Sequence, residues 1–141
     1  MRIAEDAQWS EVRNLEMQKK RLLVIEDDEE MRSLLSDFLQ EERWEIDSAG
    51  DASEAFHKLV REAFDLIITD LRMPGLSGLD IIPRIKKLRP EASIVAITAF
   101  GSEDIHRRVL ERGAALYLEK PLVFQELRRC IEKLIFSKTQ T

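Results

Sequence analysis

The feature that most restricts the fold is a regular alternation of short apolar segments with longer amphipathic ones. Each short segment has the length of a β-strand, whereas each longer segment repeats its apolar residues at helical spacing. The pattern predicts strands at residues 21–25, 45–49, 65–70, 93–98 and 115–118. It predicts helices at residues 29–42, 52–62, 79–88, 103–112 and 122–136.

Strands that alternate with helices are typical of a parallel sheet that is covered on both faces. Right-handed crossover connections then favour a doubly wound sheet. The sequence therefore predicts an α/β fold of the flavodoxin-like type, with five βα units and a five-stranded parallel sheet in the order 2-1-3-4-5. Pro83 lies inside the third expected helix, where a proline removes a backbone hydrogen bond. We expect this helix to begin late or to bend between Leu79 and Pro83.

The composition limits the possible functions. The chain has 141 residues, of which 44% are hydrophobic, and this suits one domain with its own core. The net charge is −5 and the basic residues are spread along the chain, so we expect no direct binding to nucleic acid. No apolar run is long enough to span a membrane and no signal peptide is visible, which favours a cytoplasmic protein without a membrane partner. The single cysteine, Cys130, excludes a disulfide framework.

The two ends of the chain differ from its body. Residues 1–19 are polar and contain four scattered large apolar residues, Ile3, Trp9, Val12 and Leu15. We interpret them as an N-terminal extension that is either a short helix or disordered, and we favour a helix with some contact to the body. Residues 20–136 form the expected working domain, and residues 137–141 form a short polar tail.

Functional side chains stand where the expected strands end. Asp70 ends an apolar strand and is followed at once by the turn-forming sequence Leu-Arg-Met-Pro-Gly. Glu26 and Asp27 follow the first strand, Thr98 ends the fourth, and Lys120 comes shortly after the fifth. Because the carboxyl ends of parallel strands meet at one edge of the sheet, we expect these side chains to lie together. Their combination suits a divalent cation and a phosphoryl group.

The acids have the chemistry of a magnesium site. Mg²⁺ prefers six oxygen ligands and keeps several water molecules. We expect Asp27 and Asp70 to be direct ligands and Glu26 to bind directly or through water. The backbone carbonyl group of Arg72 would complete the protein ligands.

The same residues predict a phosphoryl-transfer site. An aspartate carboxylate such as Asp70 can act as a nucleophile and form an aspartyl phosphate. Such transfer depends on positioning and on neutralisation of charge, which the ammonium group of Lys120 can supply. The hydroxyl group of Thr98 can donate to a phosphoryl oxygen.

Four segments together resemble the receiver domain of two-component response regulators, over roughly residues 20–136. They are LLVIEDDE at 22–29, DLIITDLRMPGLSG at 65–78, ITA at 97–99 and LEKP at 118–121. The resemblance implies that Asp70 is the phospho-acceptor, that Glu26 and Asp27 are the acidic pair for Mg²⁺, and that Lys120 is the family's site lysine. It also implies that Thr98 and Tyr117 are the switch residues. The chain would then catalyse only its own phosphoryl transfer and autodephosphorylation.

The resemblance implies a histidine kinase or phosphotransfer protein as phosphoryl donor, and an effector protein or domain as the output. We also hypothesise a homodimer through the fourth and fifth expected helices, with Arg107, Arg108 and Arg112 as possible cross-contacts. Two forms of the chain remain open: a stand-alone receiver, or the receiver of a longer DNA-binding transcriptional regulator. A pseudo-receiver that only binds conflicts with the complete residue set. A haloacid-dehalogenase-type phosphohydrolase conflicts with Arg72, which stands where that class has its second acid.

Overall fold

The computed structural model describes residues 19–40, 43–74 and 76–136. Five parallel strands form the central sheet: β1 (Lys20–Ile25), β2 (Trp44–Ala49), β3 (Leu66–Asp70), β6 (Ser93–Thr98) and β7 (Leu116–Glu119). Their order is β2-β1-β3-β6-β7, which confirms the predicted flavodoxin-like order. The chain passes from each parallel strand to the next in sequence through the helices α2 (Glu29–Leu39), α3 (Ala52–Arg61), α4 (Gly78–Leu88) and α5 (Glu103–Glu111), and it ends its described part in α6 (Phe124–Phe136).

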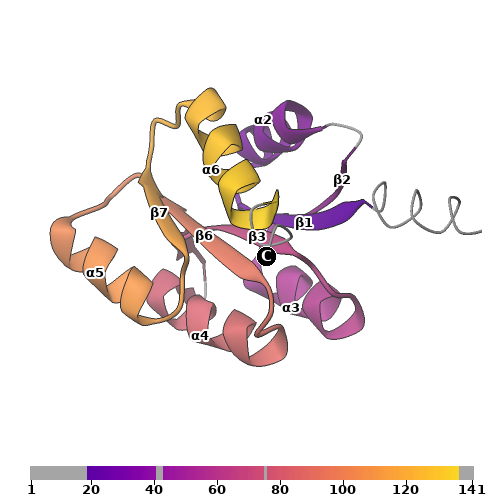
Figure 1. Ribbon diagram of the computed structural model, residues 1–141. Coiled ribbons are helices and arrows are strands. Elements are labelled where there is room, and N and C mark those ends of the chain that lie inside the picture. Colours follow the sequence, from indigo (N-terminus) through magenta and orange to yellow (C-terminus); the bar gives the residue numbers. More distant parts are fainter. Residues whose placement is uncertain (1–18, 41–42, 75, 137–141) are drawn as a thin grey trace, which may run out of the picture.

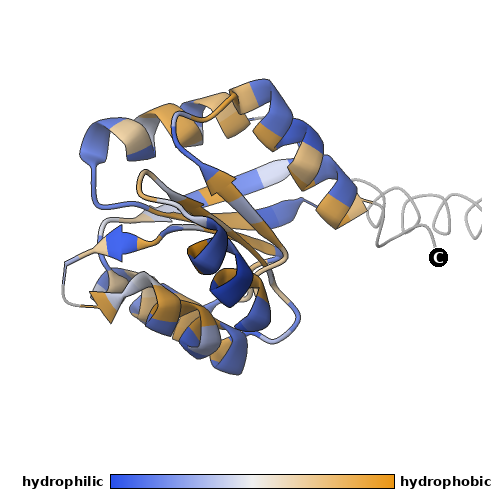
Figure 2. Ribbon diagram, turned by 90° about the vertical axis from the view of Figure 1, so that its left-hand side faces the viewer, coloured by the Kyte–Doolittle hydropathy of each residue, from blue (hydrophilic) through white to orange (hydrophobic). Residues whose placement is uncertain are grey.

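Helices cover both faces of the sheet. Helices α2 and α6 lie on one face, and α3, α4 and α5 lie on the other (Figure 1). Strand residues alternate between two buried clusters because successive side chains of a strand point to opposite faces. Leu23 and Ile25 of β1 belong to the cluster under α3, α4 and α5, whereas Leu22 and Val24 belong to the cluster under α2 and α6. In Figure 2 the sheet is coloured mostly as hydrophobic and the outer sides of the helices mostly as hydrophilic.

Several boundaries differ from those predicted. Helix α2 ends at Leu39 rather than at residue 42, and residues 41–42 lie outside the described part. Helix α6 begins at Phe124, two residues later than expected. The predictions for residues 1–18 and 137–141 concern segments outside the described residues.

The prediction that the third expected helix begins late is wrong. Helix α4 begins at Gly78, where the hydroxyl group of Ser77 accepts a hydrogen bond from the N–H of Leu79 at 3.3 Å. Pro83 lies within the helix on its exposed side. Water can therefore reach the carbonyl group of Leu79, which a proline four residues later cannot bond. The bend near Pro83 stays a prediction.

A short antiparallel pair that the sequence did not predict separates β3 from α4. It consists of β4 (Arg72–Met73) and β5 (Leu76–Ser77), which pair Arg72 with Ser77 and Met73 with Leu76. The pair brings the start of α4 against the residue that follows β3. A β-carbon at Gly78 would overlap the backbone of Leu71, so this position has room for glycine alone.

We expect the substitution Gly78→Ala to lower the free energy of unfolding by about 2 kcal/mol, because an extra methyl group here must displace backbone. Urea denaturation measures the change. Gly50→Ala is the matched control, because a β-carbon at Gly50 would lie 2.9 Å from Nη1 of Arg32, the end of a flexible side chain. Equal losses of stability in the two variants would contradict the close approach of Gly78 to Leu71.

Candidate functional site

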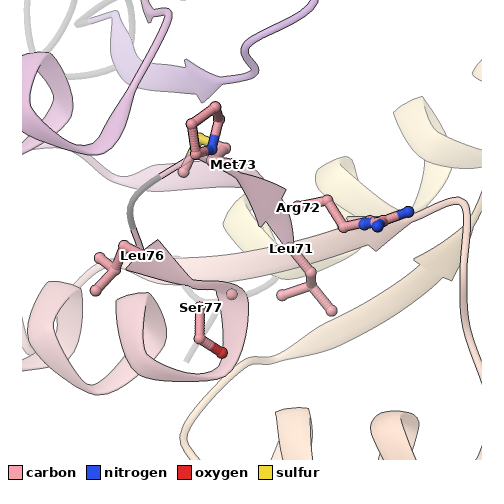
Figure 3. Close-up of a pocket in the computed structure, with 7 residues that line it drawn as sticks. Leu71, Arg72, Met73, Leu76 and Ser77 are labelled. Atoms are coloured by element: carbon pink, nitrogen blue, oxygen red, sulfur yellow. The ribbon is translucent and has the colours of Figure 1, made fainter.

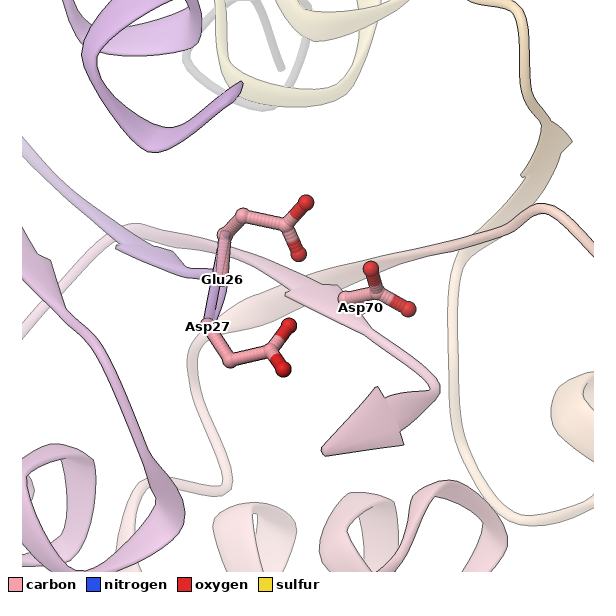
Figure 4. Close-up of side chains that lie close together, drawn as sticks. All are labelled: Glu26, Asp27 and Asp70. Carbon is pink, nitrogen blue, oxygen red and sulfur yellow. The ribbon is translucent and has the colours of Figure 1, made fainter. Parts of the chain in front are cut away.

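The register of the sheet brings three carboxylates together. Ile25 of β1 pairs with Thr69 of β3, so the residues that follow them, Glu26 and Asp70, are neighbours at the same edge. Asp27 comes next along the chain. One carboxylate oxygen from each of the three residues lies within 4.8 Å of the others. Figure 4 shows the three side chains close together. The predicted acidic cluster is therefore present.

Lys120 joins this cluster from the other side. Thr98 at the end of β6 pairs with Glu119 of β7, and the N–H of Lys120 donates to the carbonyl oxygen of Thr98 at 2.8 Å. The ammonium group of Lys120 lies 2.7 Å from Oδ2 of Asp70 and 2.8 Å from Oε1 of Glu26. The peptide bond between Lys120 and Pro121 is cis. One cation thus contacts two of the three acids directly.

Burial and these contacts shift the pKa values of the groups in the site. Burial, the neighbouring Asp70 and their hydrogen bond raise the pKa of Glu26 to about 8, against the opposing effect of Lys120. Burial opposes ionisation of Asp70 too, but hydrogen bonds from Glu26, Lys120 and the N–H of Arg72 hold the pKa of Asp70 below its ordinary value. Burial lowers the pKa of Lys120, and its bonds to the two acids outweigh this and raise it. Asp70 is therefore the carboxyl group of the pair that ionises more readily, and Glu26 is the one that keeps its proton to higher pH.

The cluster fits a divalent cation. Glu26 has no exposed surface, and its Oε2 is buried without a hydrogen-bond partner among the described residues. A buried acceptor oxygen without a partner is costly unless a donor or cation satisfies it. Asp27 is exposed, so a cation with its water molecules can approach from that side.

Backbone and side-chain groups outside the predicted set orient the acids. The N–H of Arg72 donates to Oδ1 of Asp70 at 2.8 Å. Nη1 of Arg32, near the start of α2, donates to the carbonyl oxygen of Glu26 at 2.8 Å. Sequence reasoning missed both groups: an arginine on the first turns of a helix carries no signal that it reaches back to a strand end. Arg72 as a metal ligand through its carbonyl oxygen stays a prediction.

The two predicted switch residues are on neighbouring strands: Thr98 ends β6, and Tyr117 lies within β7. Thr98 is 2% exposed, and its hydroxyl oxygen accepts a hydrogen bond from the N–H of Phe100 at 3.1 Å. The ring of Tyr117 stacks on His106 of α5, with ring centroids 4.6 Å apart, and its hydroxyl group donates to Oε1 of Glu119 at 3.0 Å. A β-carbon at Gly101 would overlap the hydroxyl group of Tyr117, so glycine at this position leaves room for that group.

A hollow of ≈ 600 Å³ lies next to the acidic cluster without containing it. Residues of the β4–β5 pair and its neighbours line it, and Figure 3 shows the side chain of Arg72 directed away from Met73 and Leu76. The guanidinium group of Arg72 lies 4.1 Å from the ring centroid of Phe100, a residue that is 67% exposed.

Comparison with known proteins shows the family to which this chain belongs. The family of response regulator receiver domains matches residues 22–132. The DNA-binding transcriptional regulator NtrC of Azospirillum brasilense is 37% identical over 123 residues, which cover 87% of this chain and 26% of that protein. The chain thus spans about a quarter of the length of that curated relative.

Two solved structures have the same fold. A CheY-like response regulator receiver domain protein from Methanospirillum hungatei JF-1 has a TM-score of 0.80 and 28% identity, with 88% of this chain and 100% of that chain covered. The response regulator TrrA from Thermotoga maritima, in complex with Mg(2+)-BeF, has a TM-score of 0.73 and 37% identity, with 82% of this chain and 98% of that chain covered. In the described part of this chain, no helix is both long and apolar enough to cross a membrane.

Proposed function

The chain belongs to the response regulator receiver domains of two-component systems, and we propose that it works by accepting a phosphoryl group on Asp70. The observation that carries the proposal is the 2.7 Å contact between Oδ2 of Asp70 and the ammonium group of Lys120, within the cluster that Glu26 and Asp27 complete. Asp70 is only 4% exposed, but its neighbour Asp27 is exposed, so a donor can approach from the side of Asp27. An ionised carboxylate that is held by a cation in this way is positioned as a nucleophile.

In the proposed reaction an oxygen of Asp70 attacks phosphorus. The new P–O bond forms as the bond from phosphorus to the donor group breaks, and the donor leaves with that electron pair. The N–H of Arg72 holds Oδ1 of Asp70, so the carboxylate is fixed in one orientation. Lys120 neutralises charge that builds up on the phosphoryl oxygens. The hydroxyl group of Thr98 can then donate a hydrogen bond to one of those oxygens.

We propose that Asp27, Asp70 and Glu26 hold Mg²⁺ beside the phosphoryl group. The unpartnered Oε2 of Glu26 supports this, and the Mg(2+)-BeF complex of TrrA provides a parallel in a relative. The cation would supply neutralisation of phosphoryl charge. Glu26 would lose its proton when the cation binds, because a carboxylate coordinates in its ionised form.

We propose a histidine kinase or a phosphotransfer protein as the phosphoryl donor and an effector protein or domain as the output. Release of Tyr117 from His106 and Glu119 would accompany movement of Thr98 toward the phosphoryl group. These movements would alter the face formed by α5, β7 and α6. Because NtrC is a DNA-binding regulator of which the chain spans 26%, we favour a DNA-binding regulator as the setting. Nucleic-acid contact by this chain itself is not part of the proposal.

A homodimer through α5 and α6 remains part of the proposal. Two of the arginines suggested for cross-contacts are already bound within α5, because Arg107 and Arg108 contact Asp104 at 2.6 and 3.2 Å. Arg112 forms no ion pair with a described residue and is therefore the better candidate. Sedimentation of the phosphorylated protein tests the dimer, and a monomer at high protein concentration would contradict it.

Incubation with acetyl phosphate tests the proposed reaction. In the presence of Mg²⁺ we expect the intact mass to increase by one phosphoryl group. Removal of the cation with EDTA should prevent the increase. An unchanged mass at repeated early time points, with Mg²⁺ binding shown independently, would contradict the proposed reaction and favour a domain that only binds.

We expect the affinity for Mg²⁺ to rise with pH. Since the pKa of Glu26 is raised to about 8, this group carries a proton at pH 7 and competes with the cation. The dissociation constant should fall by up to about tenfold per pH unit below pH 8 and level off above it. Calorimetric titration with MgCl₂ measures this dependence. Glu26→Gln should bind more weakly with a flat pH profile, whereas a flat profile in the unaltered protein would contradict the role of Glu26.

A further inference from the structure

Away from the acidic cluster, two hollows on α3 and α4 adjoin each other at Phe56. One hollow of ≈ 230 Å³ lies between Phe56 of α3 and Arg84, Lys87 and Leu88 of α4. The other follows α3 and shares Phe56 with the first. Figure 1 shows α3 and α4 next to each other on the same face of the sheet. Asp51, Ser53, Glu54 and His57 line the second hollow toward the start of α3. We call the rest of this surface, toward the end of α3, the α3–α4 groove, and its members are Phe56, Val60, Arg61, Arg84, Lys87 and Leu88.

The α3–α4 groove has an apolar floor and a basic rim. Val60 is 66% exposed and Leu88 is 39% exposed, and each lines one of the hollows together with the half-buried Phe56. Arg61, Arg84 and Lys87 border these side chains, and none of the three forms an ion pair with any residue that the structure describes. Apolar side chains together with unpaired cations suit an amphipathic segment that has acids beside its apolar face.

The N-terminal end of the described chain lies at one end of this groove. Nη2 of Arg21, the second residue of β1, is 3.0 Å from Oε2 of Glu62, which directly follows α3. The guanidinium group of Arg21 also lies 5.1 Å from the ring centroid of Phe64. Residues 1–18 therefore join the domain beside the end of α3. As a helix they would span about 27 Å, whereas the ten residues of α3 span about 15 Å.

The sequence of residues 1–18 has the complementary chemistry. Three large apolar residues recur at every third position, a spacing that places neighbours on one side of a helix: Trp9, Val12 and Leu15. Four acids and only two bases accompany them, so the segment carries net negative charge from Glu5, Asp6, Glu11 and Glu16.

We propose that residues 1–18 bind in the α3–α4 groove of their own chain as an amphipathic helix. Trp9 and Val12 cover Val60, Phe56 and Leu88, and the acids of the segment face the basic rim. The segment is tethered close to its site, so its effective concentration there is in the millimolar range and a modest interface is sufficient. The proposal is independent of the phosphoryl chemistry, because the groove shares no residue with the acidic cluster.

Fluorescence of Trp9 in the full chain tests this proposal. The sequence contains two tryptophans, and the other, Trp44, is 3% exposed. We expect acrylamide to quench both poorly in the unaltered protein. In the double variant Val60→Glu with Leu88→Glu, Trp9 should become as accessible as a free tryptophan. Leu110→Glu is the matched control, because Leu110 is 42% exposed on α5, and it should leave Trp9 protected.

A charge-reversed variant makes the test independent of the apolar substitutions. Lys87→Glu should raise the quenching of Trp9, and salt should raise it in the unaltered protein, because both weaken attraction to the basic rim. Free quenching of Trp9 in the unaltered protein would overturn the proposal, as would unchanged protection in both groove variants. Protection that appears only at high protein concentration would also overturn it, because the segment would then occupy a second copy of the chain.

Discussion

The variant Asp70→Asn is expected to accept no phosphoryl group from acetyl phosphate. The asparagine amide keeps the size of the side chain, but it is a poor nucleophile and cannot form an acyl phosphate in the same reaction. Its fold should be preserved, since Arg72 can still donate to the remaining side-chain oxygen that replaces Oδ1. Intact-protein mass spectrometry over a time course with Mg²⁺ measures the loss.

Asp28→Asn is the matched control for this variant. Asp28 follows the acidic pair directly, but it is exposed and its side chain makes no capping bond to α2. We expect it to be phosphorylated at the rate of the unaltered protein. Persistent phosphorylation of Asp70→Asn would contradict the assignment of Asp70 as the acceptor. Glu26 or Asp27 would then be the candidate acceptor.

The variant Lys120→Met is expected to accept a phosphoryl group on the order of a hundredfold more slowly, the size of the effect when one charge-stabilising group is removed from an active site. Methionine keeps much of the length of lysine but removes the cation that contacts Asp70 and Glu26 at 2.7 and 2.8 Å. Initial rates of phosphorylation from acetyl phosphate at saturating Mg²⁺ measure the loss.

Mg²⁺ affinity separates this effect from simple damage to the site. Lys120 competes with a bound cation for the same carboxylates, so its removal should leave the affinity unchanged or stronger. Lys120→Arg keeps the charge in a planar group of different geometry. Its phosphorylation rate should lie between that of the unaltered protein and that of Lys120→Met. A rate within twofold of the unaltered protein in Lys120→Met would contradict the proposed role of the ammonium group.

The sequence was most informative where long-range order follows from a repeating pattern. The alternation of strands and helices predicts a parallel sheet, and the order of its strands is confirmed. Once the strands are parallel and in register, residues that follow Ile25 and Thr69 must meet at one edge. The meeting of Glu26, Asp27 and Asp70 therefore follows from strand ends alone, and Lys120 joins them because β7 pairs with β6.

The sequence was less informative about short or side-chain-dependent features. Strands β4 and β5 have two residues each, too few to show an alternating pattern. The contact from Arg32 to the carbonyl oxygen of Glu26 depends on a side-chain conformation that composition does not determine. Stacking of Tyr117 on His106 was missed for the same reason, since helix α5 carries other polar residues that could equally have faced β7.

The position of the phosphoryl group on the chain shows directly whether Asp70 is the acceptor. Borohydride reduces an aspartyl phosphate to an alcohol, and trypsin then separates the candidate acids, because it cleaves after Arg21, Arg32, Arg61 and Arg72. We expect the reduced residue to be Asp70, in the peptide of residues 62–72. Reduction in the peptide of residues 22–32, or at Asp65 in the peptide of residues 62–72, would contradict the assignment of Asp70 as the acceptor.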